Sequence, residues 1–174
     1  ALQEAKFDVV GLDVINDYYD PALKYDRLKA QGFDKSLIDF NTSIRSTENP
    51  SRQFILLNLT DKGALGHLFQ EQQFDLVVHL AAQAGVLYSL ENPMAYVESN
   101  LVGFANILGA CRKYPVRHFL FASSSSVYGQ NLEIPFSTSH QTDHPISFYA
   151  ATKKANEVMA HSYAHLYGIP TTGM

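Results

Sequence analysis

The sequence is poor in cysteine and in basic residues, and each shortage excludes a class of protein. The single cysteine, Cys111, excludes an internal disulfide framework and a four-thiolate zinc site. We interpret it as a core thiol in a reducing compartment and expect a cytoplasmic protein. The chain has 13 Lys+Arg against 17 Asp+Glu, a formal net charge of −4. Because such a chain offers no basic surface to a polyanion, we predict no nucleic-acid partner.

Long apolar runs are also missing. No stretch approaches the roughly 18 consecutive apolar residues that a membrane span needs, and the longest apolar runs, such as Phe54–Leu57, have the length of a strand. We therefore predict no membrane partner. The 174 residues, 46% of them hydrophobic, suffice for one globular core. We expect a single domain over residues 1–174.

Short apolar strands alternate with helical patterns along the chain. The expected strands are residues 9–12, 54–59, 74–80 and 119–122, with the start of another after Pro170. Between them we expect a helix that carries Leu65, Leu68 and Phe69, and two long helices over 93–113 and 148–167. Strands that are apolar on both faces and alternate with helices are typical of a parallel sheet covered by helices. The prediction is an α/β fold with a doubly wound parallel sheet, a Rossmann-like dinucleotide-binding architecture.

The polar stretch from Asn16 to Arg52 interrupts this alternation. Pro21, followed by apolar residues up to Leu28, favours a short helix. The apolar residues between Phe33 and Phe40 favour a second one, and residues 42–51 have the composition of a loop.

The first candidate functional residue is Asp13, which closes the first strand. In dinucleotide-binding folds an acidic residue at that place receives the adenosine ribose, about 20 residues after a glycine-rich phosphate loop. An aspartate at a strand end can equally be a turn residue. No phosphate loop occurs in the sequence. If Asp13 binds ribose, we expect that loop before residue 1.

Tyr149 and Lys153 form the most informative pair. Residues four apart lie on one face of a helix, so the lysine ammonium can stabilise a tyrosine phenolate, which can then act as a general base. The alternative is a half-buried tyrosine beside a lysine with a buried stem and an exposed ammonium. The four serines 123–126, which follow an apolar strand, favour the catalytic interpretation. Parallel sheets bind ligands at that end of their strands.

The histidines do not suggest a metal site. His79 lies inside an apolar run, without a second ligand at metal-binding spacing, so we interpret it as structural. His161 and His165 share a helix face and could pair on a metal, but a solvated face is the simpler interpretation. We predict no metal.

Three segments together resemble the extended short-chain dehydrogenase/reductase family: residues 81–86 (AAQAGV), Ser124-x-x-Val127-Tyr128-Gly129, and Tyr149-x-x-x-Lys153. Residues 16–20, 88–93 and 148–172 are more narrowly similar to UDP-glucuronate 4-epimerases, of the kind that serve bacterial polysaccharide biosynthesis. Asn58 and Leu87 depart from the pattern, which usually has Asp and Arg there. Leu87 removes a positive charge that could lie near an anionic substrate.

The resemblance implies roles for particular residues. Tyr149 would be the base, Lys153 its activating partner and a ligand of the nicotinamide ribose, and Ser124, with Ser126 as a second candidate, the hydrogen-bond donor to the sugar. The NAD-binding residues that it implies, besides Tyr149 and Lys153, are Asp13, Asn16, Asp17, Asn58, Leu59, Leu80, Ala81, Ala82, Gln83, Ala84, Ser99 and Asn100.

The implied reaction inverts carbon 4 of UDP-glucuronate or UDP-galacturonate through a 4-keto sugar, with NAD kept bound. The alternatives are a UDP-hexose or UDP-N-acetylhexosamine 4-epimerase, a 4,6-dehydratase, or a catalytically incomplete fragment that serves only in association. A dehydratase would need an acidic pair beside Ser124, where the chain has Ser125 and Ser126. The resemblance also implies a phosphate loop before residue 1 and a substrate-binding region after Met174, so the chain alone is expected to be inactive. The two long helices, 93–113 and 148–167, would form a homodimer.

Overall fold

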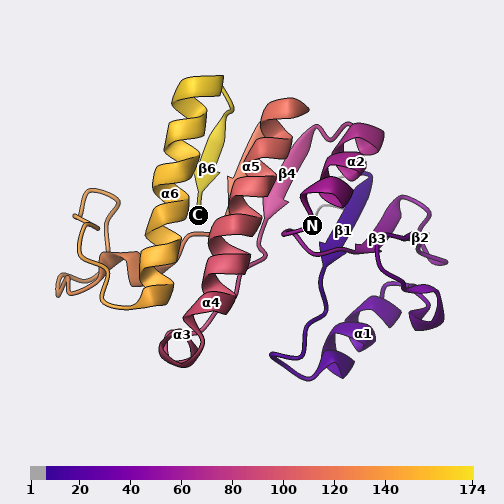
Figure 1. The fold of residues 1–174 in the computed structure, drawn as a ribbon, viewed down its shortest axis with the longest axis horizontal. Helices are drawn as coiled ribbons and strands as arrows, with labels where there is room; N and C mark the ends of the chain where they lie inside the picture. The colour runs from indigo at the N-terminus through magenta and orange to yellow at the C-terminus, as the bar shows by residue number, and fades with distance from the viewer. Residues whose placement is uncertain (1–6) are drawn as a thin grey trace. The chain divides into compact units, whose positions relative to one another are not determined.

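The computed structural model describes residues 7–174, which form two compact units that divide after Ala64. Each unit contains a three-stranded sheet (Figure 1). In both sheets strands pair in parallel and helices connect them, so the predicted parallel α/β class is confirmed. That the units make one domain stays a prediction.

The first unit is built on β1 (Val9–Asp13) and β3 (Arg52–Leu56), which pair in parallel with Asp13 opposite Leu56. Phe54 to Leu57 are buried, whereas Asn58 is exposed and already belongs to the following turn. The strand therefore ends before residue 59, earlier than its apolar run suggests. Helix α1 (Pro21–Lys29) begins as predicted, with the Asp20 carboxylate accepting from the Ala22 amide.

Two expectations for the 16–52 stretch are wrong. The second helix is reduced to one 3₁₀ turn, η1 (Lys35–Leu37), because Phe33 is buried against Phe54 in a small core. The presumed loop contains β2 (Ser43–Arg45), which pairs antiparallel with β3. Both errors come from contacts with a strand that follows later in the chain.

The second unit contains β4 (Leu76–His79), β5 (His118–Phe121) and β6 (Thr171–Gly173), in the order β4-β5-β6 and all parallel. Helices α5 (Phe104–Lys113) and α6 (Phe148–Tyr167) lie side by side on one face of this sheet (Figure 1). The core beneath them is aromatic, with Phe104 edge-on to Phe119 and Phe121 at 5.7 and 5.5 Å.

The predicted helix over 93–113 is continuous, but its middle is not α-helical. It runs through α4 (Pro93–Tyr96), a π-helical segment η2 (Val97–Gly103) and then α5. A π-helical segment is rare and is often found at functional sites. Nothing in the apolar spacing distinguishes it from an ordinary helix.

The remaining elements are two short connections and helix α2, which contains the point where the two units divide. Helix α2 (Lys62–Gln72) buries Leu65, Leu68 and Phe69 as predicted, and the Asp61 carboxylate caps it by accepting from the Ala64 amide. The other two elements are α3 (Tyr88–Glu91) and the 3₁₀ turn η3 (Ser125–Tyr128). Within residues 7–174, no helix combines the length and apolarity that crossing a bilayer demands.

Candidate active site

Tyr149 and Lys153 lie in the first turns of α6. The Ser147 hydroxyl caps this helix by accepting from the Ala150 amide at 3.0 Å, and Gly168 ends it in the left-handed conformation. These two signals determine the helix register, so Tyr149 and Lys153 share a face one turn apart. Tyr149 is half-buried, and its ring meets that of the buried Tyr96 edge-on at 6.0 Å.

Lys153 is only 2% exposed. This contradicts the alternative interpretation, in which the lysine would hold its ammonium out in solvent. Burial lowers the pKa of its ammonium, an effect that the Glu157 carboxylate opposes. Within residues 7–174 no hydrogen bond or ion pair engages this ammonium. The side chain of Lys153 is thus almost fully buried, and its ammonium is free to bond an acceptor that a ligand supplies.

Ser124 and Ser126 lie just beyond the end of β5. Ser124 is the N-cap residue of η3, and its hydroxyl accepts from the Ser126 amide at 3.2 Å. A hydroxyl that accepts from the backbone keeps its own proton for another acceptor. Both serines therefore lie at the carboxyl end of a parallel strand, as predicted, and Ser124 can still donate a hydrogen bond.

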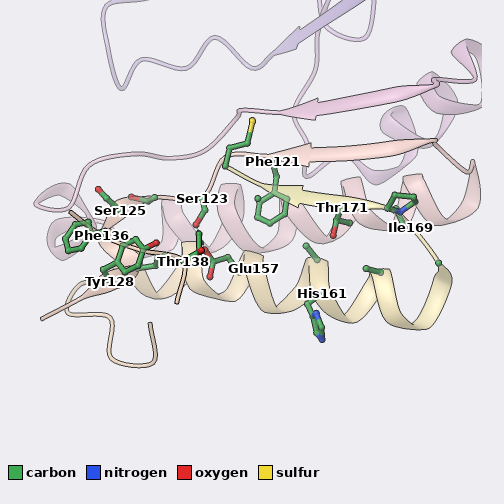
Figure 2. A pocket seen from close by; sticks show the side chains of 18 residues that line it. Phe121, Ser123, Ser125, Tyr128, Phe136, Thr138, Glu157, His161, Ile169 and Thr171 are labelled. Atoms are coloured by element: carbon green, nitrogen blue, oxygen red, sulfur yellow. Dashed lines mark hydrogen bonds between the residues drawn. The ribbon is translucent and has the colours of Figure 1, made fainter. Parts of the chain in front are cut away.

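A cavity of about 870 Å³ opens beside Ser124, between α6, β6 and the segment that follows β5 (Figure 2). In it the Ser123 hydroxyl donates to the Glu157 carboxylate at 2.5 Å. Among the described residues its lining includes neither Tyr149 nor Lys153. The cavity thus adjoins the candidate site on the Ser124 side only.

The segment after β4 was predicted to line a dinucleotide. Leu80, Ala81, Ala82 and Ala84 are exposed there, so small side chains border an open surface. Gln83 instead points inward and is 5% exposed.

The π-helical segment η2 holds the next two predicted residues. Ser99 is half-buried, and Asn100 is 1% exposed, with its side-chain amide bonded to the backbone of Gln83. A direct contact of Asn100 with a dinucleotide stays a prediction.

Asp13 belongs to the first unit, at the carboxyl end of β1. Its Oδ1 accepts from the Ile15 amide and from the Lys24 ammonium, both at 2.8 Å. The side chain is 40% exposed, so the carboxylate has room for further contacts. The sequence analysis missed Lys24, although it lies on the predicted helix α1.

The remaining first-unit residues surround the ends of β1 and β3. Asn16 and Asp17 are exposed in the turn after β1. Asn58 is exposed and accepts from the Thr60 amide at 3.0 Å, while Leu59 is buried at 9%.

Two residues that the sequence analysis interpreted as structural are buried. His79 is 6% exposed, and its ring lies 5.3 Å from that of Phe104 and 6.2 Å from that of Phe119. Burial and the Lys153 charge lower the pKa of His79 to about 4. Burial raises the pKa of Cys111 to about 12, as expected of a core thiol. His161 and His165 are exposed, and no group of three potential metal ligands occurs among residues 7–174.

Comparison with known proteins adds the family. Residues 23–174 match the model of a family described as NAD dependent epimerase/dehydratase. The chain belongs to this family. It is 50% identical to Protein CapI of Staphylococcus aureus over 95% of the chain and 45% of that protein. It is 44% identical to UDP-glucuronate 4-epimerase 3 of Arabidopsis thaliana over 100% of the chain and 37% of that protein. The chain thus spans less than half the length of these relatives.

The fold agrees with that of solved members of the epimerase/dehydratase family. UDP-glucuronic acid 4-epimerase from Bacillus cereus, solved with UDP-glucuronic acid and NAD, aligns with a TM-score of 0.80 and 26% identity. The alignment covers 99% of this chain and 49% of that one. The Rossmann-like α/β fold expected from the sequence is thereby confirmed.

The residues of this chain fit the cofactor after which the epimerase/dehydratase family is named. The Lys153 ammonium has no acceptor among the described residues, and ribose hydroxyls would provide one. The exposed alanines after β4 let a flat cofactor approach the backbone, and the Asp13 carboxylate can accept from ribose hydroxyls. These groups are of the kinds that bind a dinucleotide.

Proposed function

We propose that this chain is the NAD-binding part of a nucleotide-sugar 4-epimerase that interconverts UDP-glucuronate and UDP-galacturonate. The observation that carries the proposal is the pair on α6. Tyr149 is half-buried and accessible, whereas Lys153, on the same face, is 2% exposed and lacks an acceptor within residues 7–174. A phenol beside a buried cation is suited to hold and release a proton.

Each side chain has a distinct task in this reaction. The Tyr149 phenolate takes the proton from the sugar 4-hydroxyl and later returns one to the 4-keto oxygen. Lys153 stabilises the phenolate by its charge, and Ser124 donates a hydrogen bond to the same sugar oxygen, with Ser126 as a second candidate. NAD, when bound, would accept the hydride from carbon 4 and return it to the opposite face of the 4-keto sugar, so that the net redox change is nil.

The remaining predicted residues would hold that cofactor. Asp13, with Asn16 and Asp17 beside it, would bind the adenosine ribose, and Asn58 and Leu59 would border the adenine. Lys153 would bind the nicotinamide ribose. The segment from Leu80 to Ala84 would lie along the dinucleotide, with Ser99 and Asn100 near its nicotinamide half.

The comparisons support the substrate class. Several relatives at 43–45% identity over the whole chain are called UDP-glucuronate 4-epimerases. The second candidate is a neutral UDP-hexose or UDP-N-acetylhexosamine, and Leu87 favours it. This residue is 77% exposed and apolar, at a position where an arginine would offer a charge to an anionic sugar.

The test is an assay of the intact protein with UDP-glucuronate, in which UDP-galacturonate is resolved by ion-exchange chromatography. We expect conversion with wild type and a loss of at least about 100-fold with Tyr149→Phe, since general base catalysis contributes about 10²–10⁴-fold. UDP-glucose and UDP-N-acetylglucosamine are assayed in parallel as neutral substrates. Faster conversion of a neutral sugar would favour the second candidate, and no conversion of any of the three would contradict the proposal.

We further propose a homodimer that uses helices 93–113 and 148–167. Their exposed apolar side chains support it: Met94, Val102, Val158 and Leu166 are 43–63% exposed. Sedimentation velocity of the intact protein should give a dimer at micromolar concentration. A monomer there would contradict this assembly.

A further inference from the structure

The side-chain amide of Asn100 joins two segments of the candidate site. Its Oδ1 accepts from the Gln83 amide at 2.8 Å, and its Nδ2 donates to the Gln83 carbonyl at 3.0 Å. One side chain thus satisfies both backbone groups of a residue in the segment proposed to line the dinucleotide. The two bonds hold this segment much as a neighbouring strand would.

The same amide also reaches the catalytic helix. Nδ2 donates its second hydrogen to the Thr152 hydroxyl at 3.0 Å, and that hydroxyl donates to the Tyr149 carbonyl at 2.8 Å. Asn156 Nδ2 in turn donates to the Asn100 carbonyl at 2.6 Å. We call these four residues, Gln83, Asn100, Thr152 and Asn156, the Asn100 network.

Burial makes the Asn100 network specific. Its members are 1–5% exposed, so a broken bond would leave a buried polar group unsatisfied. Both hydrogens of the Asn100 amide are used within the protein, so they are not available to a ligand. Asn100 lies in the π-helical segment η2, a kind of distortion that is common at functional sites.

A second link runs in parallel. The buried Tyr96 hydroxyl donates to the carbonyls of Ala84 and Gly85 at 2.8 and 2.5 Å, and its ring contacts that of Tyr149 edge-on. Tyr96 and Asn100 are one turn apart on the helix that runs from α4 into η2. This helix therefore touches both residues 83–85 and the first turns of α6, at two independent points.

We propose that Asn100 and Thr152 are positioning residues. They fix the position of the segment 81–85 relative to the first turns of α6, which carry Tyr149 and Lys153. This inference rests on the proposed function, because it assigns the two segments to cofactor and catalysis. The Thr152 hydroxyl lies beside Lys153 in sequence and bonds the backbone of Tyr149. Loss of that hydroxyl removes the bond from Asn100 to Thr152 and weakens the coupling of the two segments, while Tyr149, Lys153 and the Asn100–Gln83 pair stay intact.

The test compares Thr152→Val, which keeps the shape and loses the hydroxyl, with Thr152→Ser, which keeps the hydroxyl. In the intact protein we expect Thr152→Val to retain NAD about 3- to 10-fold more weakly and to lower kcat by a similar factor, with KM nearly unchanged. That factor corresponds to the loss of one buried hydrogen bond. Hydrogen exchange of the amides of residues 82–85 should rise in the same variant, and Thr152→Ser should restore all three readouts.

The matched control is Ser89→Ala. Ser89 is 1% exposed and its hydroxyl donates to the Val86 carbonyl at 2.6 Å, so the variant loses a nearby buried hydrogen bond that does not involve α6. It should leave kcat and NAD retention within about twofold of wild type. If Thr152→Val does not fold, Thr152→Ala carries the same expectation.

The outcomes separate the two proposals. Wild-type exchange at residues 82–85 in Thr152→Val, or failure of Thr152→Ser to restore it, would overturn the positioning role. If wild type neither retains NAD nor converts a sugar, the proposed function fails. Hydrogen exchange then still decides whether the Asn100 network couples the two segments.

Discussion

The Ser123 hydroxyl donates to Glu157 Oε1 at 2.5 Å, which joins the end of β5 to the middle of α6 (Figure 2). The other carboxylate oxygen of Glu157 pairs with Lys154 at 3.4 Å, and the Lys154 ammonium also donates to the Thr142 hydroxyl. The charge of Glu157 further opposes the lowering of the Lys153 pKa by burial. The Glu157 carboxylate therefore holds the serine segment by a hydrogen bond and favours the charged form of Lys153, the residue next to the candidate base Tyr149 on the helix face.

We expect Glu157→Ala to destabilise the intact protein by about 1–2 kcal/mol, because the Ser123 hydroxyl and the Lys154 ammonium each lose an acceptor. Urea denaturation measures this. Glu157→Gln is the control, since its carbonyl oxygen still accepts from Ser123 and should preserve at least half of the difference. Equal losses in both variants would show that the negative charge, rather than the Ser123 bond, determines the stability.

Gly129 is required by the path of the chain around the serine segment. Its φ is +58°, and a Cβ atom there would lie 2.1 Å from the His144 carbonyl oxygen. Gly129→Ala should therefore cost more than the roughly 1–3 kcal/mol of a left-handed residue alone, with increased proteolysis between residues 130 and 146.

Gly109→Ala provides the comparison. Gly109 lies in α5 with nothing within 4 Å of an added Cβ, so the substitution should be neutral or stabilising by up to about 1 kcal/mol. Thermal unfolding of both variants decides. A Gly129→Ala protein as stable as wild type would mean that the close approach to His144 is relieved without cost.

His79 makes stability depend on pH. Its pKa is about 4 in the folded protein, lowered first by burial and then by the Lys153 charge, against the ordinary value of 6.5. Between these values the unfolded chain binds a proton that the folded chain does not, so stability falls as the pH drops from about 6.5 to 4. The full effect is about 3 kcal/mol, and it vanishes above pH 7.

The variant His79→Phe removes this titration and keeps a ring between Phe104 and Phe119. We measure its free energy of unfolding from pH 4 to 7. The slope of this free energy against pH should be smaller than in wild type, by up to the equivalent of about one bound proton. An identical slope in both proteins would show that other groups cause the acid sensitivity.

Cys111 should be unreactive in the native protein. It is 0% exposed, and burial raises its pKa to about 12, so almost no thiolate exists at pH 8. We expect iodoacetamide to leave it unmodified over an hour and to alkylate it fully in 6 M guanidinium, as read by peptide mass spectrometry. Rapid native labelling would contradict the burial of this residue.

The sequence by itself determined the features that depend on neighbours along the chain. Ser147 and Gly168 delimit α6, and the four-residue spacing places Tyr149 and Lys153 on one face, because capping and helical periodicity are local. Apolar runs likewise located four strands and the serine segment after β5. The family resemblance of these same segments led to the epimerase/dehydratase family, and the match of residues 23–174 confirms it.

Only the tertiary structure decided which partners these residues have. The partners of Asn100 lie 17 and 52 residues away, and the partner of Ser123 lies 34 residues away, so no local pattern could reveal them. β2 exists because β3 offers a free edge, and the turn at Lys35–Leu37 stays short because Phe33 packs against Phe54. Such contacts are set by the folded chain as a whole, since burial and hydrogen bonding between distant segments outweigh local preference.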